Sequence, residues 1–252
     1  MRRILSPDNV EVLAQYAWSR VLLAFDFDGT LAPIVADRDR AGMRATTHRL
    51  LSRVCELYPC AIISGRSRGD VTPRLNGLGV RYVMGNHGLE PGRHMAKFER
   101  EVALVRPLLE KALGSLQGVD VEDKSFSLAV HYRRSRRKRE ARKAIYDAVG
   151  TLPFAMRTIP GKLVVNVVPL RAPHKGDALL ALRAKEGADT AIYVGDDATD
   201  EDVFMLDQPG RLLSIRVGLS RASSAAYYVR DQREMDALLA RLARLRANGA
   251  PP

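Results

Sequence analysis

The hydrophobic residues of this chain fall into short unbroken runs, separated by segments in which they recur every three or four positions. The runs at 21–25, 60–63 and 191–194 are wholly apolar and are followed closely by turn-forming residues. Such runs are typical of strands buried on both faces of a parallel sheet. The segment 46–57 instead has the spacing of an amphipathic helix. The pattern predicts an α/β fold, with a Rossmann-like parallel sheet core and helices on both faces.

The alternation of strands and helices is interrupted between residues 91 and 169. There the pattern predicts a helix, two strands, a basic helix and a hairpin, at residues 96–116, 119–122 and 126–132, 137–149, and 154–159 with 163–168. This α-β-β-α-β-β order indicates a separate α+β unit inserted into a βα fold. We therefore expect a core formed by residues 1–90 and 170–252, with an inserted α+β cap domain at 91–169.

Composition indicates a globular protein. Of the 252 residues, 46% are hydrophobic and 27% are charged, and no apolar stretch is long enough to cross a membrane. Arg2 and Arg3 are not followed by a sustained apolar segment, so we expect no signal peptide. We expect Cys55 and Cys60 to be two buried thiols rather than a disulfide or a metal pair, which favours a cytoplasmic location.

The chain is strongly basic, with a net charge of +11 and a pI near 10.0. Such a charge suits either a nucleic acid or an anionic small substrate. The densest basic cluster spans Arg133–Lys143, but acids are mixed in elsewhere and no nucleic-acid-binding module is recognisable. We interpret the cluster as a solvated helix face and expect no nucleic-acid partner.

Two acids flank a single residue directly after the first buried run, in Asp26-Phe27-Asp28-Gly29-Thr30-Leu31. The carboxyl end of such a strand is where open α/β sheets bind ligands, although a strand running into an Asp-Gly turn is an alternative. The stretch resembles the first motif of the haloacid dehalogenase superfamily, D-x-D-G-T-L. The resemblance implies that Asp26 attacks phosphorus to form an aspartyl-phosphate. Asp28 would protonate the leaving oxygen and later deprotonate water.

Two further stretches resemble later motifs of the same superfamily. Ser64-Gly65-Arg66 follows the run at 60–63 and is similar to the second motif. By itself it would be an ordinary turn, but a hydroxyl and backbone N–H groups there can hold phosphate oxygens. Lys175 opens a predicted helix and matches the third motif, where a fixed ammonium neutralises the nucleophile and the phosphate together.

A run of acids follows the strand at 191–194, in Gly195-Asp196-Asp197-Ala198-Thr199-Asp200-Glu201-Asp202. So many carboxylates would repel one another without a cation, and ligands that are all oxygen suit Mg²⁺ rather than zinc. The stretch matches the pattern G-D-D-x-T-D-E-D. The resemblance implies direct Mg²⁺ ligation by Asp26, Asp196 and the main-chain carbonyl of Asp28. Asp200 would bind through water or orient the site.

Three stretches are similar to sequences of trehalose-6-phosphate phosphatases: Gly85-Asn86-His87-Gly88-Leu89-Glu90, Glu122-Asp123-Lys124 and His131-Tyr132-Arg133. Without the resemblance they would be turn residues and hairpin surface charges. It implies a set of substrate-binding residues from both domains, namely Gly65, Arg66, Asn86, His87, Gly88, Glu122, Lys124, His131, Arg133, Lys162 and Asn166. One departure stands out, because Asn166 and Val168 occupy positions where the family usually has Glu and Arg.

The resemblance implies an Mg²⁺-dependent phosphatase that hydrolyses trehalose 6-phosphate, with Asp26, Asp28, Ser64 and Lys175 as its catalytic residues. We expect a small sugar phosphate as the partner, no membrane association, and a monomer or dimer. A phosphatase for another sugar or polyol phosphate would share the core motifs but not the cap contacts. A nucleic-acid-binding protein on a phosphatase-like core would use the arginine cluster, but the intact acidic motifs argue against it.

Overall fold

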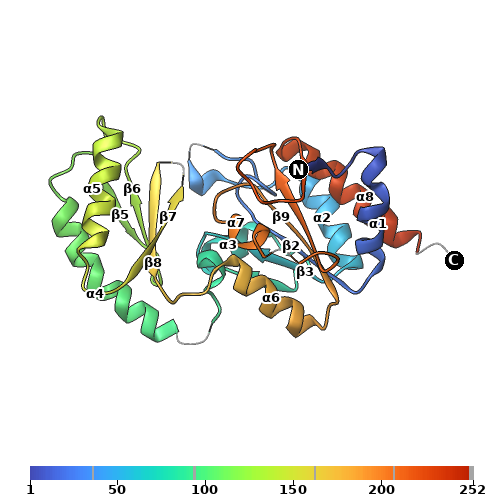
Figure 1. Cartoon of the computed structure of the whole chain (residues 1–252), viewed down its shortest axis with the longest axis horizontal. Helices are drawn as coiled ribbons and strands as arrows, with labels where there is room; N and C mark the ends of the chain where they lie inside the picture. The colour runs from blue at the N-terminus through green and yellow to red at the C-terminus, as the bar shows by residue number, and fades with distance from the viewer. Residues whose placement is uncertain (36, 93–94, 162, 207, 250–252) are drawn as a thin grey trace. The chain divides into compact units, whose positions relative to one another are not determined.

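The computed structural model describes residues 1–35, 37–92, 95–161, 163–206 and 208–249 (Figure 1). The chain divides into two compact units. The core unit consists of Met1–Gly88 and His174–Pro252, and the inserted unit consists of Leu89–Pro173. A single insertion into a βα fold therefore accounts for the division.

The core unit contains a seven-stranded sheet in the order β1-β11-β10-β9-β2-β3-β4, with every neighbouring pair parallel. Its strands are β1 (Arg2–Arg3), β2 (Val21–Phe25), β3 (Cys60–Ile63), β4 (Tyr82–Met84), β9 (Thr190–Gly195), β10 (Leu212–Val217) and β11 (Tyr227–Val229). In the centre of the sheet, Phe25 is in register with both Val194 and Ile62. The register brings the segments that follow β2, β3 and β9 to the same edge, as expected for parallel strands.

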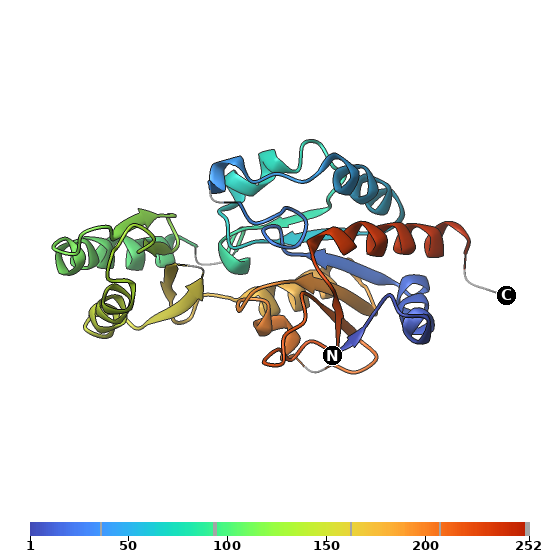
Figure 2. The same cartoon turned by 90° about the horizontal axis from the view of Figure 1, so that it is seen from above.

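Helices cover both faces of this sheet because the strands are apolar on both sides. On one face, Leu23 and Phe25 belong to a core cluster with α1 (Val10–Trp18), α2 (Ala45–Leu57) and α8 (Met235–Ala247). On the other face, Leu22 and Ala24 belong to a cluster with α6 (Lys175–Glu186) and α7 (Glu201–Phe204). Figure 2 shows the strands of this unit between helices on either side. The two-sided burial confirms the predicted fold class.

Shorter elements complete the core unit. They are α3 (Arg68–Arg74) and the 3₁₀ turns η1 (Pro7–Asn9), η2 (Arg38–Arg40), η3 (Asn86–Gly88) and η4 (Gln232–Glu234). Both cysteines are free thiols, with Cys60 buried in β3 and Cys55 only half-buried on α2. No helix in the described ranges is long and apolar enough to span a membrane.

The inserted unit is built on an antiparallel sheet in the order β5-β6-β8-β7. Its elements are α4 (Met95–Leu113), β5 (Asp120–Asp123), β6 (Leu128–His131), α5 (Lys138–Gly150), β7 (Met156–Gly161) and β8 (Val164–Pro169). One face of the sheet, carrying Leu128, Val130, Val165 and Val167, packs with both helices in a single apolar cluster. The element order is the α-β-β-α-β-β order that the sequence predicts.

The other face of this sheet carries polar residues. Glu122 of β5 is in register with Ala129 of β6, which is in register with Asn166 of β8. His131 follows Ala129 by two positions and so shares its face. Strand alternation therefore gathers Glu122, His131 and Asn166 on the face opposite the helices, although they lie far apart in the sequence.

Candidate active site

The first two acids lie in the loop after β2, at the centre of the parallel sheet. The Asp26 side chain is almost fully buried, and its backbone N–H donates to the Val194 carbonyl of β9 over 2.9 Å. Phe27 is fully buried in the core between the two acids and anchors the loop. Asp28 remains partly accessible, with 37% of its side chain exposed. The loop thus holds one buried acid and one accessible acid a single residue apart.

Gly29 allows the loop to approach the acidic segment that follows β9. Its φ is +84°, a left-handed conformation that favours glycine, and a Cβ there would overlap the Asp196 carboxylate. The next residue, Thr30, donates its hydroxyl to Asp196 Oδ1 over 3.2 Å. The glycine and the threonine of the first motif therefore bring Asp196 against the Asp26 loop.

Asp200 connects the acids to Lys175. Its Oδ1 accepts hydrogen bonds from Lys175 Nζ at 2.8 Å and from the Tyr193 hydroxyl at 2.6 Å. Its Oδ2 accepts the backbone N–H groups of Asp196 at 2.7 Å and Asp197 at 2.9 Å. A carboxylate has about four lone-pair positions, so Asp200 is saturated with protein donors. This arrangement suits a residue that orients its neighbours rather than one that gives an oxygen directly to a ligand.

Lys175 lies between Asp26 and Asp200. Its Nζ is 3.1 Å from Asp26 Oδ1 and 2.8 Å from Asp200 Oδ1, and its side chain is 1% exposed. Burial lowers the pKa of Lys175, but the carboxylates of Asp200 and Asp26 outweigh burial and raise it above its usual value. The ammonium therefore stays charged in the core and holds Asp26 in place.

The protein alone does not supply enough positive charge for the clustered acids. Burial, aided by neighbouring carboxylates and opposed by Lys175, raises the pKa of Asp26 well above its usual value. Burial and the charges of Asp200 and Asp197 raise the pKa of Asp196 to about 8. Burial also raises the pKa of Asp200, against the effect of Lys175. The cluster needs either protons or a cation.

Asp197 behaves differently from the other acids of this segment. Burial opposes its ionisation, but Lys175, hydrogen bonds from Thr199 and the charge of His87 together hold its pKa below the usual value. Its Oδ1 accepts the Thr199 hydroxyl at 2.7 Å and the Thr199 N–H at 2.8 Å. Asp197 is thus held ionised by Lys175 and by the hydrogen bonds of its own turn.

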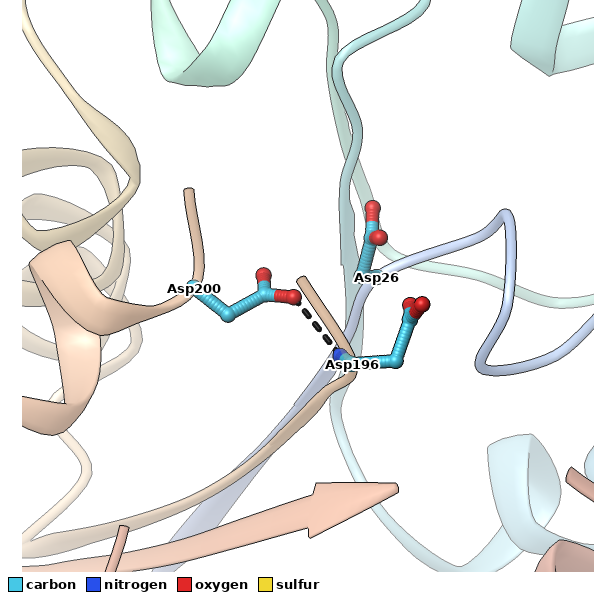
Figure 3. A group of neighbouring side chains, drawn as sticks. All are labelled: Asp26, Asp196 and Asp200. Carbon is cyan, nitrogen blue, oxygen red and sulfur yellow. Dashed lines mark hydrogen bonds between the residues drawn. The ribbon is translucent and has the colours of Figure 1, made fainter. Parts of the chain in front are cut away.

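The geometry fits a metal ion. One carboxylate oxygen from each of Asp26, Asp196 and Asp200 lies within 4.8 Å of the other two. Figure 3 shows the three side chains around a common space, with Asp200 turned toward the Asp196 N–H. The donors are all oxygen atoms, which suits a hard divalent cation. Since Asp200 is saturated, Asp26 and Asp196 are the side chains able to ligate an ion directly.

The second motif lies beside the first. Ser64 follows β3, is 1% exposed, and accepts the Arg66 N–H at 3.1 Å. Arg66, expected to bind substrate, holds Asp28 with both arms of its guanidinium, from Nε to Oδ2 at 2.6 Å and from Nη2 to Oδ1 at 2.8 Å. Its Nη1 bonds to Asp70 at 2.8 Å. Bidentate Arg–carboxylate pairs fix orientation, so Arg66 sets the position of Asp28.

The Asn86-His87-Gly88 turn packs against the second motif. The N–H of Asn86 donates to the Arg66 carbonyl at 2.7 Å, and the N–H of His87 donates to the Ser64 carbonyl at 2.9 Å. A Cβ at Gly65 would come within 2.6 Å of the His87 ring. All three residues of η3 are buried. The structure therefore brings Ser64, Gly65 and the turn together.

The remaining predicted binding residues lie in the inserted unit. Glu122 Oε2 and His131 Nε2 are 2.8 Å apart. Asn166, on the same sheet face, is 8% exposed. Lys124 directly follows β5, and Arg133 follows β6 by two residues. Lys162 lies outside the described residues.

Two residues that support the acids were not predicted from the sequence. Tyr193 is fully buried in β9 and donates to Asp200. Arg216 of β10 donates to the Asp196 carbonyl, to the Asp197 carbonyl at 3.2 Å and to Glu201 at 3.2 Å. The sequence indicated each of them by a polar side chain within an otherwise apolar strand. A buried strand tolerates such a side chain only when it has hydrogen-bond partners.

The parallel sheet, the inserted α+β unit and the acid–lysine cluster define the haloacid dehalogenase-like phosphatase fold. The chain belongs to the trehalose-phosphatase family, whose model matches residues 24–232. A solved structure of the Candida albicans trehalose-6-phosphate phosphatase C-terminal domain has a TM-score of 0.79 at 24% identity, covering 94% of this chain and 97% of that one. At this identity the likeness establishes the shared fold.

Relatives with similar sequences come from bacteria and plants. A trehalose-phosphate phosphatase of Mycolicibacterium paratuberculosis is 38% identical over 196 residues, which is 71% of this chain and 49% of the relative. A probable trehalose-phosphate phosphatase of rice, Oryza sativa subsp. japonica, is 32% identical, covering 88% of this chain and 70% of the relative. The chain thus spans about half the length of its mycobacterial relatives.

Proposed function

We propose that this protein is an Mg²⁺-dependent phosphatase that hydrolyses trehalose 6-phosphate to trehalose and phosphate. The observation that carries the proposal is the buried Asp26 held 3.1 Å from Lys175 at the end of β2. A carboxylate fixed beside an ammonium, next to further acids able to hold a cation, suits nucleophilic attack on a phosphate monoester. Membership of the trehalose-phosphatase family and the names of the relatives supply the substrate.

The reaction would proceed in two displacements. A carboxylate oxygen of Asp26 forms a bond to phosphorus while the bond to the 6-oxygen of the sugar breaks, and Asp28 gives that oxygen its proton. Asp28 then takes a proton from water as the water oxygen attacks the phosphorus of the aspartyl-phosphate, which releases phosphate and restores Asp26. Arg66 holds both Asp28 oxygens in this structure, so Asp28 would have to release at least one of these hydrogen bonds to carry the proton.

The negative charge of the transferring phosphoryl group would be stabilised from several sides. Lys175 and the Ser64 hydroxyl contact it from the protein. Asp26, Asp196 and the Asp28 main-chain carbonyl would hold Mg²⁺, with Asp200 orienting the site or acting through water. The ion would supply electrostatic stabilisation of the transferring group.

Substrate selection would come from the inserted unit. We assign residues 1–90 and 170–252 to a catalytic core and 91–169 to a substrate-specificity cap. Glu122, Lys124, His131, Arg133, Lys162 and Asn166 would hydrogen-bond the sugar hydroxyls. We also propose Gly65, Arg66, Asn86, His87 and Gly88 of the core as substrate-binding residues. The polar, helix-free sheet face supports this assignment, because it gathers Glu122, His131 and Asn166.

We further propose a cytoplasmic monomer or dimer, with no nucleic-acid or membrane partner. The two free thiols support a reducing compartment. One observation favours a second candidate substrate class: Asn166 replaces a family glutamate with a shorter, uncharged side chain, which fits a phosphatase for another sugar or polyol phosphate.

The test is phosphate release from a panel of sugar phosphates, with Mg²⁺ and with EDTA, by the parent and by Asp26→Asn. We expect trehalose 6-phosphate to be the best substrate, EDTA to remove activity, and Asp26→Asn to lose activity by more than about a thousandfold with an unchanged fold. Asp189→Asn, an exposed aspartate outside the site, is the matched control. Activity of Asp26→Asn above a thousandth of the parent would refute the nucleophile, and preference for a monosaccharide phosphate would refute the trehalose assignment.

A further inference from the structure

A basic hollow of about 660 Å³ opens on the core unit, where β11 leads into α8. Five arginines and only two acids line it, the arginines being Arg3, Arg230, Arg233, Arg241 and Arg244. In the sheet, β10 and β9 separate β11 from β2, which carries the Asp26 loop. Among the described residues, the hollow shares no lining residue with the acid–lysine site. It is therefore a separate feature of the same domain (α8 is labelled in Figure 1).

Both acids of the hollow already have partners. Glu234 is buried, forms ion pairs with Arg3 and with Arg230 at 3.0 Å, and accepts the Arg230 N–H at 2.6 Å. Asp231 Oδ1 accepts the Glu234 N–H at 3.0 Å and caps the turn that leads into α8. Glu234 thus pairs with Arg3 and Arg230, and Asp231 caps the turn, so among the described residues neither acid forms an ion pair with the other three arginines.

Arg233, Arg241 and Arg244 carry the remaining positive charge. Across the described ranges, none of the three side chains has a hydrogen-bond or ion-pair partner. Arg241 and Arg244 lie one turn apart on α8, and helix neighbours of like charge repel each other. Ala237, one turn before Arg241, also lines the hollow, and its small side chain leaves room beside the guanidinium groups. Such an arrangement is stabilised by an anion that contacts several arginines at once.

We propose that this hollow binds a small soluble ligand with two or more phosphate groups. Guanidinium groups match phosphate oxygens with paired hydrogen bonds, which makes arginine the preferred residue for phosphate recognition. The volume lies within the range of small-molecule sites. The described lining residues include no aromatic side chain on which a base could stack, so recognition runs through the phosphate groups.

The test measures tripolyphosphate binding by calorimetry at low ionic strength in EDTA. EDTA removes any divalent cation from the acidic catalytic cluster, so tripolyphosphate cannot bind there through such an ion. Arg233, Arg241 and Arg244 are changed together to Ser. The control changes Arg134, Arg136 and Arg139 to Ser, which removes the same charge from exposed positions of the inserted unit. We expect the hollow variant to bind at least about tenfold more weakly and the control to bind within about twofold of the parent.

A second variant makes the result independent of the triple substitution. Ala237→Glu adds a carboxylate at an exposed position of α8. Because Glu is a good helix former, the helix should be retained. The added negative charge should also weaken binding at least about tenfold. Thermal melting checks that each variant is folded. Equal losses in the hollow variant and the control would show attraction to net charge alone, and absence of binding by the parent would likewise overturn the proposal.

Discussion

At the scale of single residues, the site depends on side chains that position others. Asp200 accepts four hydrogen bonds, and two of them come from Lys175 and the Tyr193 hydroxyl. Because Lys175 in turn contacts Asp26, a chain of buried contacts links Tyr193 to the proposed nucleophile. In a low-dielectric site such contacts fix the positions of the side chains as well as their charge states. The loss of one contact therefore affects the reacting atoms.

The Tyr193→Phe substitution tests this chain. Loss of one buried hydrogen bond should cost about 1 kcal/mol of unfolding free energy. Because Asp200 would be held less firmly in its orientation, the Mg²⁺ concentration needed for half-maximal activity should rise by about tenfold or more. Tyr82→Phe is the matched control, since it also removes a tyrosine hydrogen bond, to Glu186 at 2.7 Å, but outside the site. An unchanged Mg²⁺ requirement in Tyr193→Phe would contradict the positioning role.

The buried acids also predict how stability without a cation depends on pH. The pKa of Asp196 is raised to about 8 in the folded protein, so the folded state binds more protons than the unfolded state between about pH 4 and pH 8. Stability without a divalent cation should therefore fall as pH rises through that window. The raised pKa values of Asp26 and Asp200 act in the same direction. Asp197, with its lowered pKa, acts only at lower pH.

Thermal melting in EDTA between pH 5 and pH 8 checks this expectation. The midpoint should fall by at least about 3 °C, the shift that roughly 1 kcal/mol produces in a domain of this size. Mg²⁺ should restore more stability at pH 8 than at pH 5, because at low pH it competes with bound protons. Asp196→Asn should flatten the slope in EDTA. A midpoint in EDTA that rises from pH 5 to pH 8 would contradict the assignment.

At the scale of elements, the sheet of the inserted unit determines which side chains act together. Strand register places Asn166 opposite Ala129, which pairs in turn with Glu122. The proposed substrate face therefore carries Asn166 at a position where the family usually has Glu. A hydrogen bond to a charged carboxylate contributes about 1.5–3 kcal/mol, against about 1 kcal/mol for a hydrogen bond between neutral groups. The exchange should weaken discrimination between sugars.

The Asn166→Glu substitution tests that difference. The ratio of kcat/KM for trehalose 6-phosphate to that for glucose 6-phosphate should rise several-fold to about tenfold, as the charged hydrogen bond is regained. Asn166→Gln has the length of Glu without its charge, and it should leave the ratio within about twofold of the parent. An equal rise in both variants would attribute the effect to length.

At the scale of the whole molecule, both units carry basic groups, the core unit at the hollow beside α8 and the inserted unit at Arg133–Lys143. The exposed cluster Arg133–Lys143 includes local pairs, Arg137 with Glu140 at 3.3 Å and Lys143 with Asp147 at 2.6 Å. Pairs of this kind on a helix surface are typical of solvated faces. The charge distribution therefore supports long-range attraction of anionic substrates more than tight binding of a polymer.

Oligonucleotide titrations near physiological salt check this view. We expect duplex and single-stranded oligonucleotides to bind with a dissociation constant weaker than about 1 μM, as for non-specific contacts with phosphates. Submicromolar affinity that is lost when Arg136, Arg137 and Arg139 become Ala would identify a nucleic-acid site.

The sequence by itself determined the fold class and the motifs of the core. Unbroken apolar runs can only be buried on both faces, and acids directly after them must lie at the carboxyl edge of a parallel sheet. The predicted strand at 21–25 matches β2 residue for residue. The order of the motifs that contain Asp26, Ser64, Lys175 and Asp196 could be predicted, because each motif follows a buried apolar run or opens a helix.

Only the tertiary structure decided which side chains contact one another. Arg66 binds Asp28, and Tyr193 and Arg216 support the acidic segment, because parallel strands distant in sequence meet at one edge. The arginines around α8 come together for the same reason, since β1 pairs with β11 at the far end of the sheet. Periodicity fixes which face a residue occupies, but register and crossover connections fix its neighbours, and these depend on contacts that no local pattern encodes.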